Sequence, residues 1–124
     1  MLNSHFSDLL SVKLIEAKKY NKIEDSDVPD GDITIATWWE TAEWLMDLSN
    51  AKGSKAYFIQ HHEVHEYLPI ERSKATYKLP LHKIVIAKWL KDIMENEYGD
   101  RCVELVPNSI DHQQFYSDKR NKQE

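Results

Sequence analysis

The chain of 124 residues has little cysteine and little glycine, and each shortage excludes a class of structure. Cys102 is its one cysteine, so no disulfide can form within the chain, which is typical of a reducing compartment. The three glycines, Gly31, Gly53 and Gly99, lie far apart. Neither a P-loop nor the G-x-G-x-x-G loop that binds dinucleotides can be built from them.

Long apolar runs and an excess of positive charge are also missing. No stretch approaches the ~20 apolar residues that a membrane-spanning helix needs. The start, Met1 to His5, lacks the basic and apolar regions of a signal peptide. The formal net charge is −5, which argues against nucleic acid as the main partner. We therefore expect a cytoplasmic protein that binds no nucleic acid; peripheral contact with the inner face of the membrane stays open.

The residues that are present predict one globular domain. Hydrophobic residues make up 41% of the chain and charged residues 30%, which is typical of a folded protein. Strand-like and helix-like patterns alternate between residues 32 and 106, which predicts an α/β fold: a Rossmann-like parallel sheet with crossover helices. Strands are expected at 33–36, 55–60, 83–87 and 102–106, with a fifth candidate at 12–17; helices are expected at 40–48, 71–79 and 88–98, with one further turn at 6–10.

Side-chain patterns predict which parts of these elements are buried. Ile33, Ile35 and Ala36 form a short apolar run rich in β-branched residues, which favours a buried strand. On the last helix, a set of apolar side chains at helical spacing is expected to face inward, namely Trp89, Leu90, Ile93, Met94 and Tyr98.

The ends of the helices carry their own signals. Thr37 or Thr41 is expected to cap the first helix, and Glu40 adds negative charge near its positive end. The segment Asn50 to Ser54, with Gly53, is expected to stop that helix, and Gly99 is suited to follow the last one.

Polar and aromatic residues follow the first two strands. Thr37-Trp38-Trp39-Glu40 comes after the first strand, and His61-His62-Glu63 comes after the second. In open α/β sheets ligands bind at the carboxyl ends of the strands, so we expect these loops to open side by side on one rim. Both tryptophans can pack on helices, or one can be buried while the other faces a ligand, because adjacent residues of an extended segment point opposite ways.

The histidines around Glu63 suggest a zinc site, but their spacing does not fit one. A metalloprotease motif is H-E-x-x-H, whereas His62-Glu63-Val64-His65 is one residue short and follows a strand. We therefore expect no metal. Two interpretations stay open: a polar loop after a strand, or a histidine that acts as a base or hydrogen-bond partner.

Four stretches together resemble one enzyme family. They are ATWWETAEWL at 36–45, KAYFIQHHE at 55–63, KIVIAKWLKDIMENEYG at 83–99, and ELVPNSID at 104–111 followed by Phe115. In this order they resemble the amino-terminal domain of GT-B glycosyltransferases of family 4, in the rhamnosyltransferase-like branch. The resemblance covers about residues 30–116 and departs at Ser109, where the family has glycine, and at Lys88, where it often has serine.

The resemblance implies a function and a role for individual residues. It implies a retaining transferase, without metal or cofactor, that moves a sugar from a nucleotide-sugar to a glycan or lipid-linked acceptor. Residues 1–116 would be a partial acceptor-side domain and 117–124 a charged tail at the interdomain linker. The implied catalytic residues are His61 and His62; the implied substrate-binding residues are Thr37, Trp38, Trp39, Glu40 and Glu63; the implied interdomain junction comprises Pro107, Asn108, Ser109 and Asp111.

The same resemblance implies that parts of the enzyme are missing. The family begins with a strand and a glycine-rich loop that nothing before Met1 supplies, and its nucleotide-sugar-binding domain would start near residue 117. We therefore expect a truncated chain that is inactive alone and self-associates through an exposed sheet edge. Two other hypotheses remain: a small non-enzymatic α/β module that binds a ligand or partner, and a metal-dependent hydrolase that uses the histidines.

Overall fold

The computed structural model describes residues 13–17 and 22–117. In chain order the elements are η1 (Asp25–Asp27), β1 (Ile33–Ala36), α1 (Trp39–Asp47), η2 (Asn50–Lys52), β2 (Ser54–Ile59), α2 (Ile70–Thr76), β3 (His82–Val85), α3 (Lys88–Glu97) and β4 (Val103–Leu105). Strands and helices thus alternate from β1 to β4, as the sequence pattern predicts.

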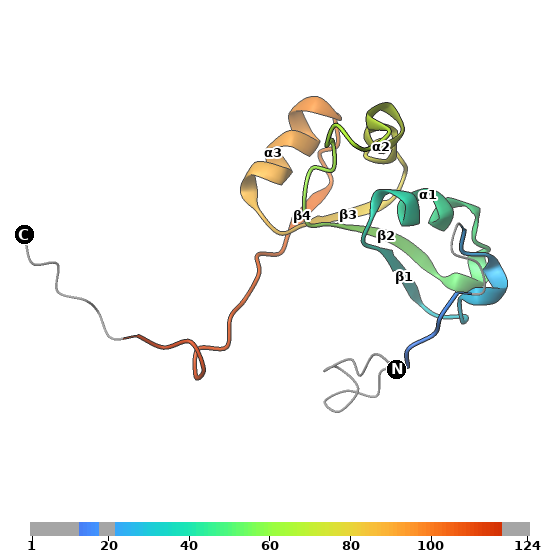
Figure 1. Ribbon diagram of the computed structural model, residues 1–124, viewed down its shortest axis with the longest axis horizontal. Helices are drawn as coiled ribbons and strands as arrows, with labels where there is room; N and C mark the ends of the chain where they lie inside the picture. The colour runs from blue at the N-terminus through green and yellow to red at the C-terminus, as the bar shows by residue number, and fades with distance from the viewer. Residues whose placement is uncertain (1–12, 18–21, 118–124) are drawn as a thin grey trace, which may run out of the picture.

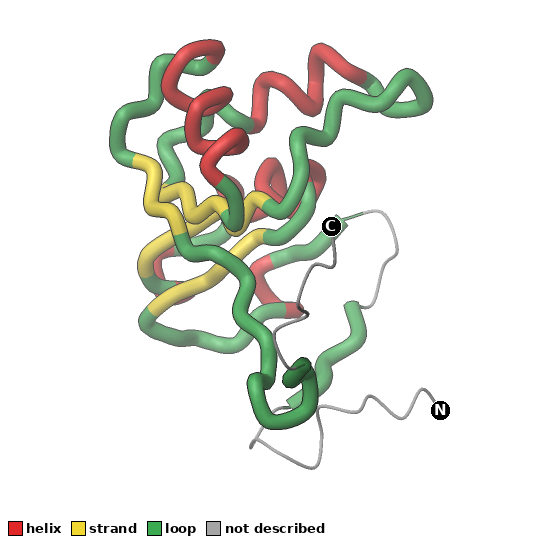
Figure 2. Tube along the Cα trace, turned by 90° about the vertical axis from the view of Figure 1, so that its left-hand side faces the viewer, coloured by secondary structure: helices red, strands yellow, loops and turns green. Residues whose placement is uncertain are grey.

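The four strands form one parallel sheet in the order β1-β2-β3-β4. Parallel crossovers are almost always right-handed, so a sheet that grows in one direction receives all its connections on the same face. Figures 1 and 2 show this arrangement: α1, α2 and α3 lie together on one side of the sheet. The prediction of a Rossmann-like α/β fold with crossover helices is confirmed.

The hydrophobic core fills the space between the sheet and its helices. Its strand side chains alternate along each strand, because every second residue of a strand faces the helices. The main contributors are Tyr57 and Ile59 from β2, Val85 from β3, Val103 from β4, Ala42 and Leu45 from α1, and Leu90 and Met94 from α3.

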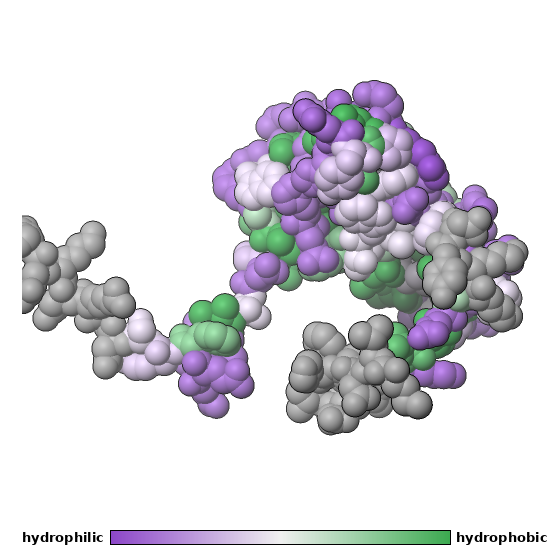
Figure 3. All heavy atoms as spheres, viewed as in Figure 1, coloured by the Kyte–Doolittle hydropathy of each residue, from purple (hydrophilic) through white to green (hydrophobic). Residues whose placement is uncertain are grey.

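The opposite face of the sheet carries no helix in the described part of the chain, and this overturns one prediction. Ala36 is buried, but Ile33 is 63% exposed and Ile35 is 52% exposed. Both isoleucines point away from the helices, since they alternate with Thr34 and Ala36 along β1. Figure 3 shows apolar surface on this lower side of the molecule. The expected burial of Ile33 and Ile35 required a second layer, which the described residues do not supply.

One predicted inward side chain of α3 is also exposed. Trp89 is 48% exposed, whereas the next residue, Leu90, is fully buried. Consecutive helical residues point about 100° apart, so a helix that buries Leu90 and Met94 turns Trp89 toward its flank. Ile93 and Tyr98 are partly buried against the core, as expected.

Two predicted features near the ends of elements differ from the structure. Residues 13–17 have no regular structure, with Leu14 70% and Ile15 45% exposed, so the strand expected there is wrong for these five residues. Residue 12 and the turn expected at 6–10 lie outside the described residues. Gly53, with φ +76°, follows η2 and does not stop α1, which already ends at Asp47 because Leu48 is extended. Gly99, with φ +72°, does follow α3 after Tyr98.

Candidate functional site

The loops after β1 and β2 meet at the carboxyl edge of the sheet. The backbone N–H of Trp39, the first residue of α1, donates a hydrogen bond to Glu63 Oε2 at 3.0 Å. A carboxyl group at this position faces the positive end of the α1 dipole. Thr41 supports the same turn, because its hydroxyl oxygen accepts the N–H of Trp38 at 3.0 Å. The expectation that these two loops open side by side is confirmed.

Glu63 is buried at this edge of the sheet and hydrogen-bonded to three other segments. Only 6% of its surface is exposed. Its backbone N–H donates to the Tyr77 hydroxyl at 2.8 Å, and its carbonyl oxygen accepts the Ser73 hydroxyl. Burial raises the pKa of the Glu63 carboxyl, although the Trp39 N–H acts to lower it. The structure therefore places Glu63 beneath the rim as a link between α1, α2 and the loop after β2.

Three tyrosines cluster beside Glu63, and the sequence interpretation expected only one of them, Tyr98, to face inward. The rings of Tyr57 and Tyr77 stack with centroids 5.8 Å apart and planes 6° apart, and the centroid of Tyr98 lies 5.0 Å from that of Tyr77. Burial raises the pKa of Tyr57 and Tyr77, and it raises the pKa of Tyr98 to about 12. All three hydroxyls therefore keep their protons at neutral pH. They come from three different elements, so no local sequence motif marks them as a cluster.

His62 is part of this internal network. Its Nε2 lies 2.7 Å from the Tyr98 hydroxyl, and its ring centroid is 5.4 Å from that of Tyr77. Partial burial lowers the pKa of His62, although Glu97 acts to raise it. The imidazole is therefore neutral at pH 7, and its Nε2 is already engaged.

Among the three histidines of the loop after β2, His61 is the one that is exposed. Its Nδ1 lies 3.0 Å from the His62 carbonyl oxygen. Because a carbonyl oxygen can only accept, Nδ1 carries the proton and donates it in this hydrogen bond. In the neutral ring Nε2 then has a free lone pair, which is the arrangement that a general base requires.

The structure separates the roles of the two tryptophans. Trp39 is 3% exposed and packs under the Arg72 guanidinium, whose Cζ lies 5.0 Å from the centroid of the Trp39 ring. Its Nε1 has no hydrogen-bond partner among the described residues. Trp38 is half-buried, with its ring centroid 6.4 Å from that of Trp39. One tryptophan is thus buried while the other reaches the rim, beside the exposed Thr37 and the half-buried Glu40.

The residues expected at an interdomain junction lie apart from this rim. Pro107, Asn108, Ser109 and Asp111 are all exposed, in a segment that runs away from the sheet after β4 (Figure 1). Asp111 Oδ1 accepts the N–H of Gln113 at 2.8 Å, which forms a local turn. The structure does not bring these four residues together with His61 and His62.

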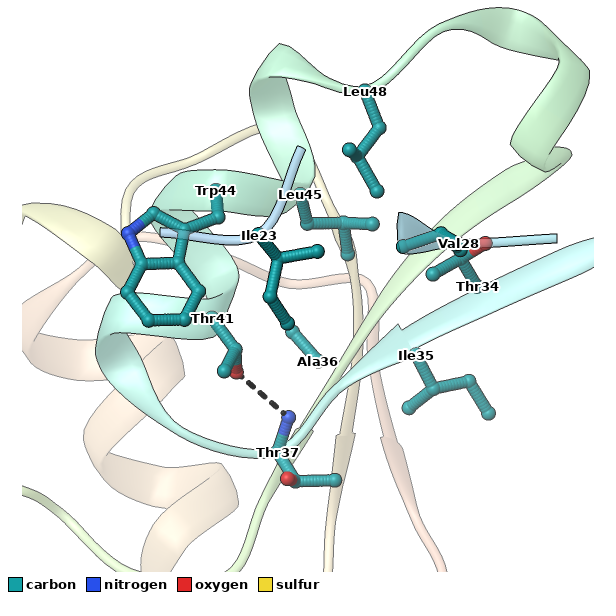
Figure 4. A pocket seen from close by; sticks show the side chains of 10 residues that line it. All are labelled: Ile23, Val28, Thr34, Ile35, Ala36, Thr37, Thr41, Trp44, Leu45 and Leu48. Atoms are coloured by element: carbon teal, nitrogen blue, oxygen red, sulfur yellow. Dashed lines mark hydrogen bonds between the residues drawn. The ribbon is translucent and has the colours of Figure 1, made fainter. Parts of the chain in front are cut away.

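An apolar cavity that the sequence interpretation overlooked opens beside β1 (Figure 4). Its volume is about 130 Å³, and the Thr37 N–H donates to Thr41 Oγ1 at its rim, at 3.3 Å. Most of its wall is aliphatic or aromatic: Ile23, Val28, Thr34, Ile35, Ala36, Thr37, Thr41, Trp44, Leu45 and Leu48.

Within the described residues, no group of three or more histidine, cysteine, aspartate or glutamate side chains is arranged to hold a metal ion. None of the described helices has the length and apolar composition that crossing a membrane requires. No protein-family model matches the chain, and searches of curated proteins and of solved structures found no match.

Proposed function

We propose that this chain is the acceptor-side half of a retaining GT-B glycosyltransferase of the rhamnosyltransferase-like branch. The proposal comes from the four motifs of the sequence, and one structural observation supports it. The loops that contain residues 37–40 and 61–63 meet at the carboxyl rim of a parallel sheet. Such a rim is where α/β proteins bind their ligands. The substrates would be a nucleotide-sugar donor and a glycan or lipid-linked acceptor.

The geometry favours His61 over His62 as the base that accepts a proton from the acceptor hydroxyl. His61 is exposed with a free Nε2, whereas Nε2 of His62 is 2.7 Å from the Tyr98 hydroxyl. Thr37 and Trp38 would form the neighbouring wall, with Glu40 behind them. Glu63 and Trp39 would act as positioning residues, since both are buried.

The donor would bind to another stretch of polypeptide, because the chain has no glycine-rich loop to hold a diphosphate. Enzymes lower reaction barriers by ~8–23 kcal/mol, much of it through oriented groups around developing charge. One general base supplies only about 10²–10⁴-fold. We therefore expect residues 1–124 alone to transfer no sugar, and we expect the assembled enzyme to work in the cytoplasm, with contact with the inner face of the membrane left open.

The coding DNA on both sides of these residues provides the first test. A reading frame for a nucleotide-sugar-binding domain is expected beside it. Coexpressed with that domain, this chain should transfer sugar from UDP-, GDP- or dTDP-sugars, and His61→Ala should slow transfer by about 10²–10⁴-fold. His62→Ala serves as the matched control, with a smaller loss expected. Turnover by residues 1–124 alone, or full transfer by His61→Ala, would contradict the proposal.

A second candidate is a non-enzymatic module that binds a small apolar ligand, and the cavity beside β1 favours it. An apolar molecule of the size of benzene should then bind with one saturable site, followed in ¹H–¹⁵N correlation spectra, and lose affinity in Ala36→Leu, which fills the cavity. Binding that Ala36→Leu leaves unchanged would count against this candidate.

A further inference from the structure

Four aromatic rings form a row across the carboxyl rim. The ring centroids of Tyr67 and His65 are 5.3 Å apart with planes 5° apart, and those of His65 and His61 are 5.1 Å apart. The row continues to Trp89, whose centroid lies 5.8 Å from that of His61 in an edge-to-face contact. The loop after β2 is thereby joined to the first turn of α3.

Both ends of this row are open to solvent. Tyr67 is 79% exposed and Trp89 is 48% exposed, whereas Tyr57, Tyr77 and Trp39 are each at most 3% exposed. Stacked rings that already hold one orientation lose little conformational entropy when a ligand binds to them. The row therefore offers two flat, ordered apolar faces beside the free Nε2 of His61.

The charges near the row favour a neutral ligand. Glu66, next to Tyr67, is exposed, and Lys88, next to Trp89, is already paired with Asp92 at 2.8 Å. The phosphates of a nucleotide would lie near the negative charge of Glu66, and Lys88, which is already paired, would not be free to balance them. A pyranose ring has apolar C–H faces for aromatic rings and hydroxyl groups for the histidine, and it carries no charge.

We propose that Tyr67 and Trp89 are stacking faces for pyranose rings of the acceptor glycan. His61 lies between them to accept the proton of an acceptor hydroxyl, as that oxygen bonds to the anomeric carbon of the donor sugar and the nucleoside diphosphate leaves. This inference rests on the proposed transferase function and specifies how its acceptor binds. His65 is a positioning residue, because it holds Tyr67 parallel to the row.

Titration of the full chain with methyl α-D-glucopyranoside and with methyl α-L-rhamnopyranoside, followed by ¹H–¹⁵N correlation spectra, tests this inference. At least one glycoside should shift the indole N–H of Trp89 and the amides of residues 65–67 in a saturable way, and leave the indole N–H of Trp44 unchanged. Tyr67→Ala should weaken binding by about fivefold, and Tyr67→Ala with Trp89→Ala by at least about tenfold. Phe115→Ala, which removes a 69% exposed aromatic ring elsewhere, should leave affinity unchanged.

Three outcomes would overturn the inference. They are the absence of a saturable shift with either glycoside, shifts confined to Thr37 and Trp38, and a stronger response of the row to uridine monophosphate. Because Tyr67 is so exposed, Tyr67→Ala should keep its fold. It therefore keeps the test decisive even if the double variant is unstable. A coexpressed enzyme that transfers sugar while Tyr67 and Trp89 show no response would separate failure of the stacking faces from failure of the transferase function.

Discussion

At the scale of single residues, Gly53 is a position where both the backbone conformation and the lack of space favour glycine. Its φ is +76°, and a Cβ added there would lie 2.2 Å from the carbonyl carbon of Asp32. Gly99 has a similar φ of +72°, but nothing lies within 4 Å of its added Cβ. Both glycines therefore have a backbone conformation that favours glycine, but only Gly53 also lacks room for a Cβ.

Gly53→Ala should therefore lose more stability than Gly99→Ala. The positive φ is expected to destabilise each variant by about 1–3 kcal/mol. Gly53→Ala also forces backbone atoms apart where the chain enters β1, so its loss should exceed that range. Urea unfolding of both variants measures the difference, and equal losses would show that the contact with Asp32 relaxes without strain.

The carboxyl of Glu63 should make stability depend on pH. Burial raises its folded pKa above the ordinary value of 4.5, so the native state holds the proton more tightly than the unfolded chain. Its contribution is then fully present below pH 4.5 and is lost as pH rises through the folded pKa. In Glu63→Gln, which keeps an acceptor for the Trp39 N–H, this loss should disappear.

The measurement for Glu63 is the free energy of unfolding of wild type and Glu63→Gln at several pH values between 4 and 8. The difference between them should change in favour of the variant as pH rises. His62→Gln is a control of opposite sign: burial lowers the pKa of His62, so wild type loses that histidine's contribution as pH falls below 6.5. A pH-independent difference for Glu63→Gln would show that Glu63 has the same pKa in both states.

At the scale of secondary structure, α3 separates what periodicity can predict from what it cannot. The apolar spacing places Leu90 and Met94 in the core, and both are fully buried. It also places Trp89 there, but a side chain at the edge of an apolar stripe is buried only if a neighbouring element covers it. Trp89 remains 48% exposed, in edge-to-face contact with the His61 ring.

Truncation of the two neighbours should therefore have unequal effects on stability. Leu90→Ala is expected to lose about 2–5 kcal/mol, because it opens a cavity among fully buried side chains. Trp89→Ala should lose less than about 1.5 kcal/mol, mainly its contact with His61. Thermal or urea unfolding of both variants checks the order, and a larger loss for Trp89→Ala would place that ring in the core.

The rim also has features that the sequence predicts and features that it does not. The sequence predicts that TWWE and HHE lie together, because parallel strands bring their carboxyl ends to one edge. It does not predict that Glu63 is buried, since its partners Trp39, Ser73 and Tyr77 come from α1, α2 and the turn after α2. Which side chain of a polar loop turns inward depends on such distant partners, and a single sequence does not contain their positions.

At the scale of the whole molecule, the helices cover one face of the sheet and leave β1 at an edge. Ser54 N–H donates to the Asp32 carbonyl at 2.8 Å, so by alternation Thr34 and Ala36 also direct their backbone groups toward β2. The backbone groups of Ile33 and Ile35 then face outward, and no described strand pairs with them. An open, apolar edge of this kind is a template for pairing with another chain.

We therefore expect two copies of the chain to pair through β1, with Ile33 and Ile35 of each copy shielding the other. Sedimentation velocity over a range of protein concentrations should show a dimer that grows with concentration. Ile35→Lys should shift the equilibrium to monomer, because a charge on an edge strand opposes pairing. Ile110→Lys is the matched control, since Ile110 is 59% exposed in the segment after β4. If wild type stays a stable monomer throughout, the β1 edge needs no further strand, and the argument that this sheet is part of a larger one loses its support.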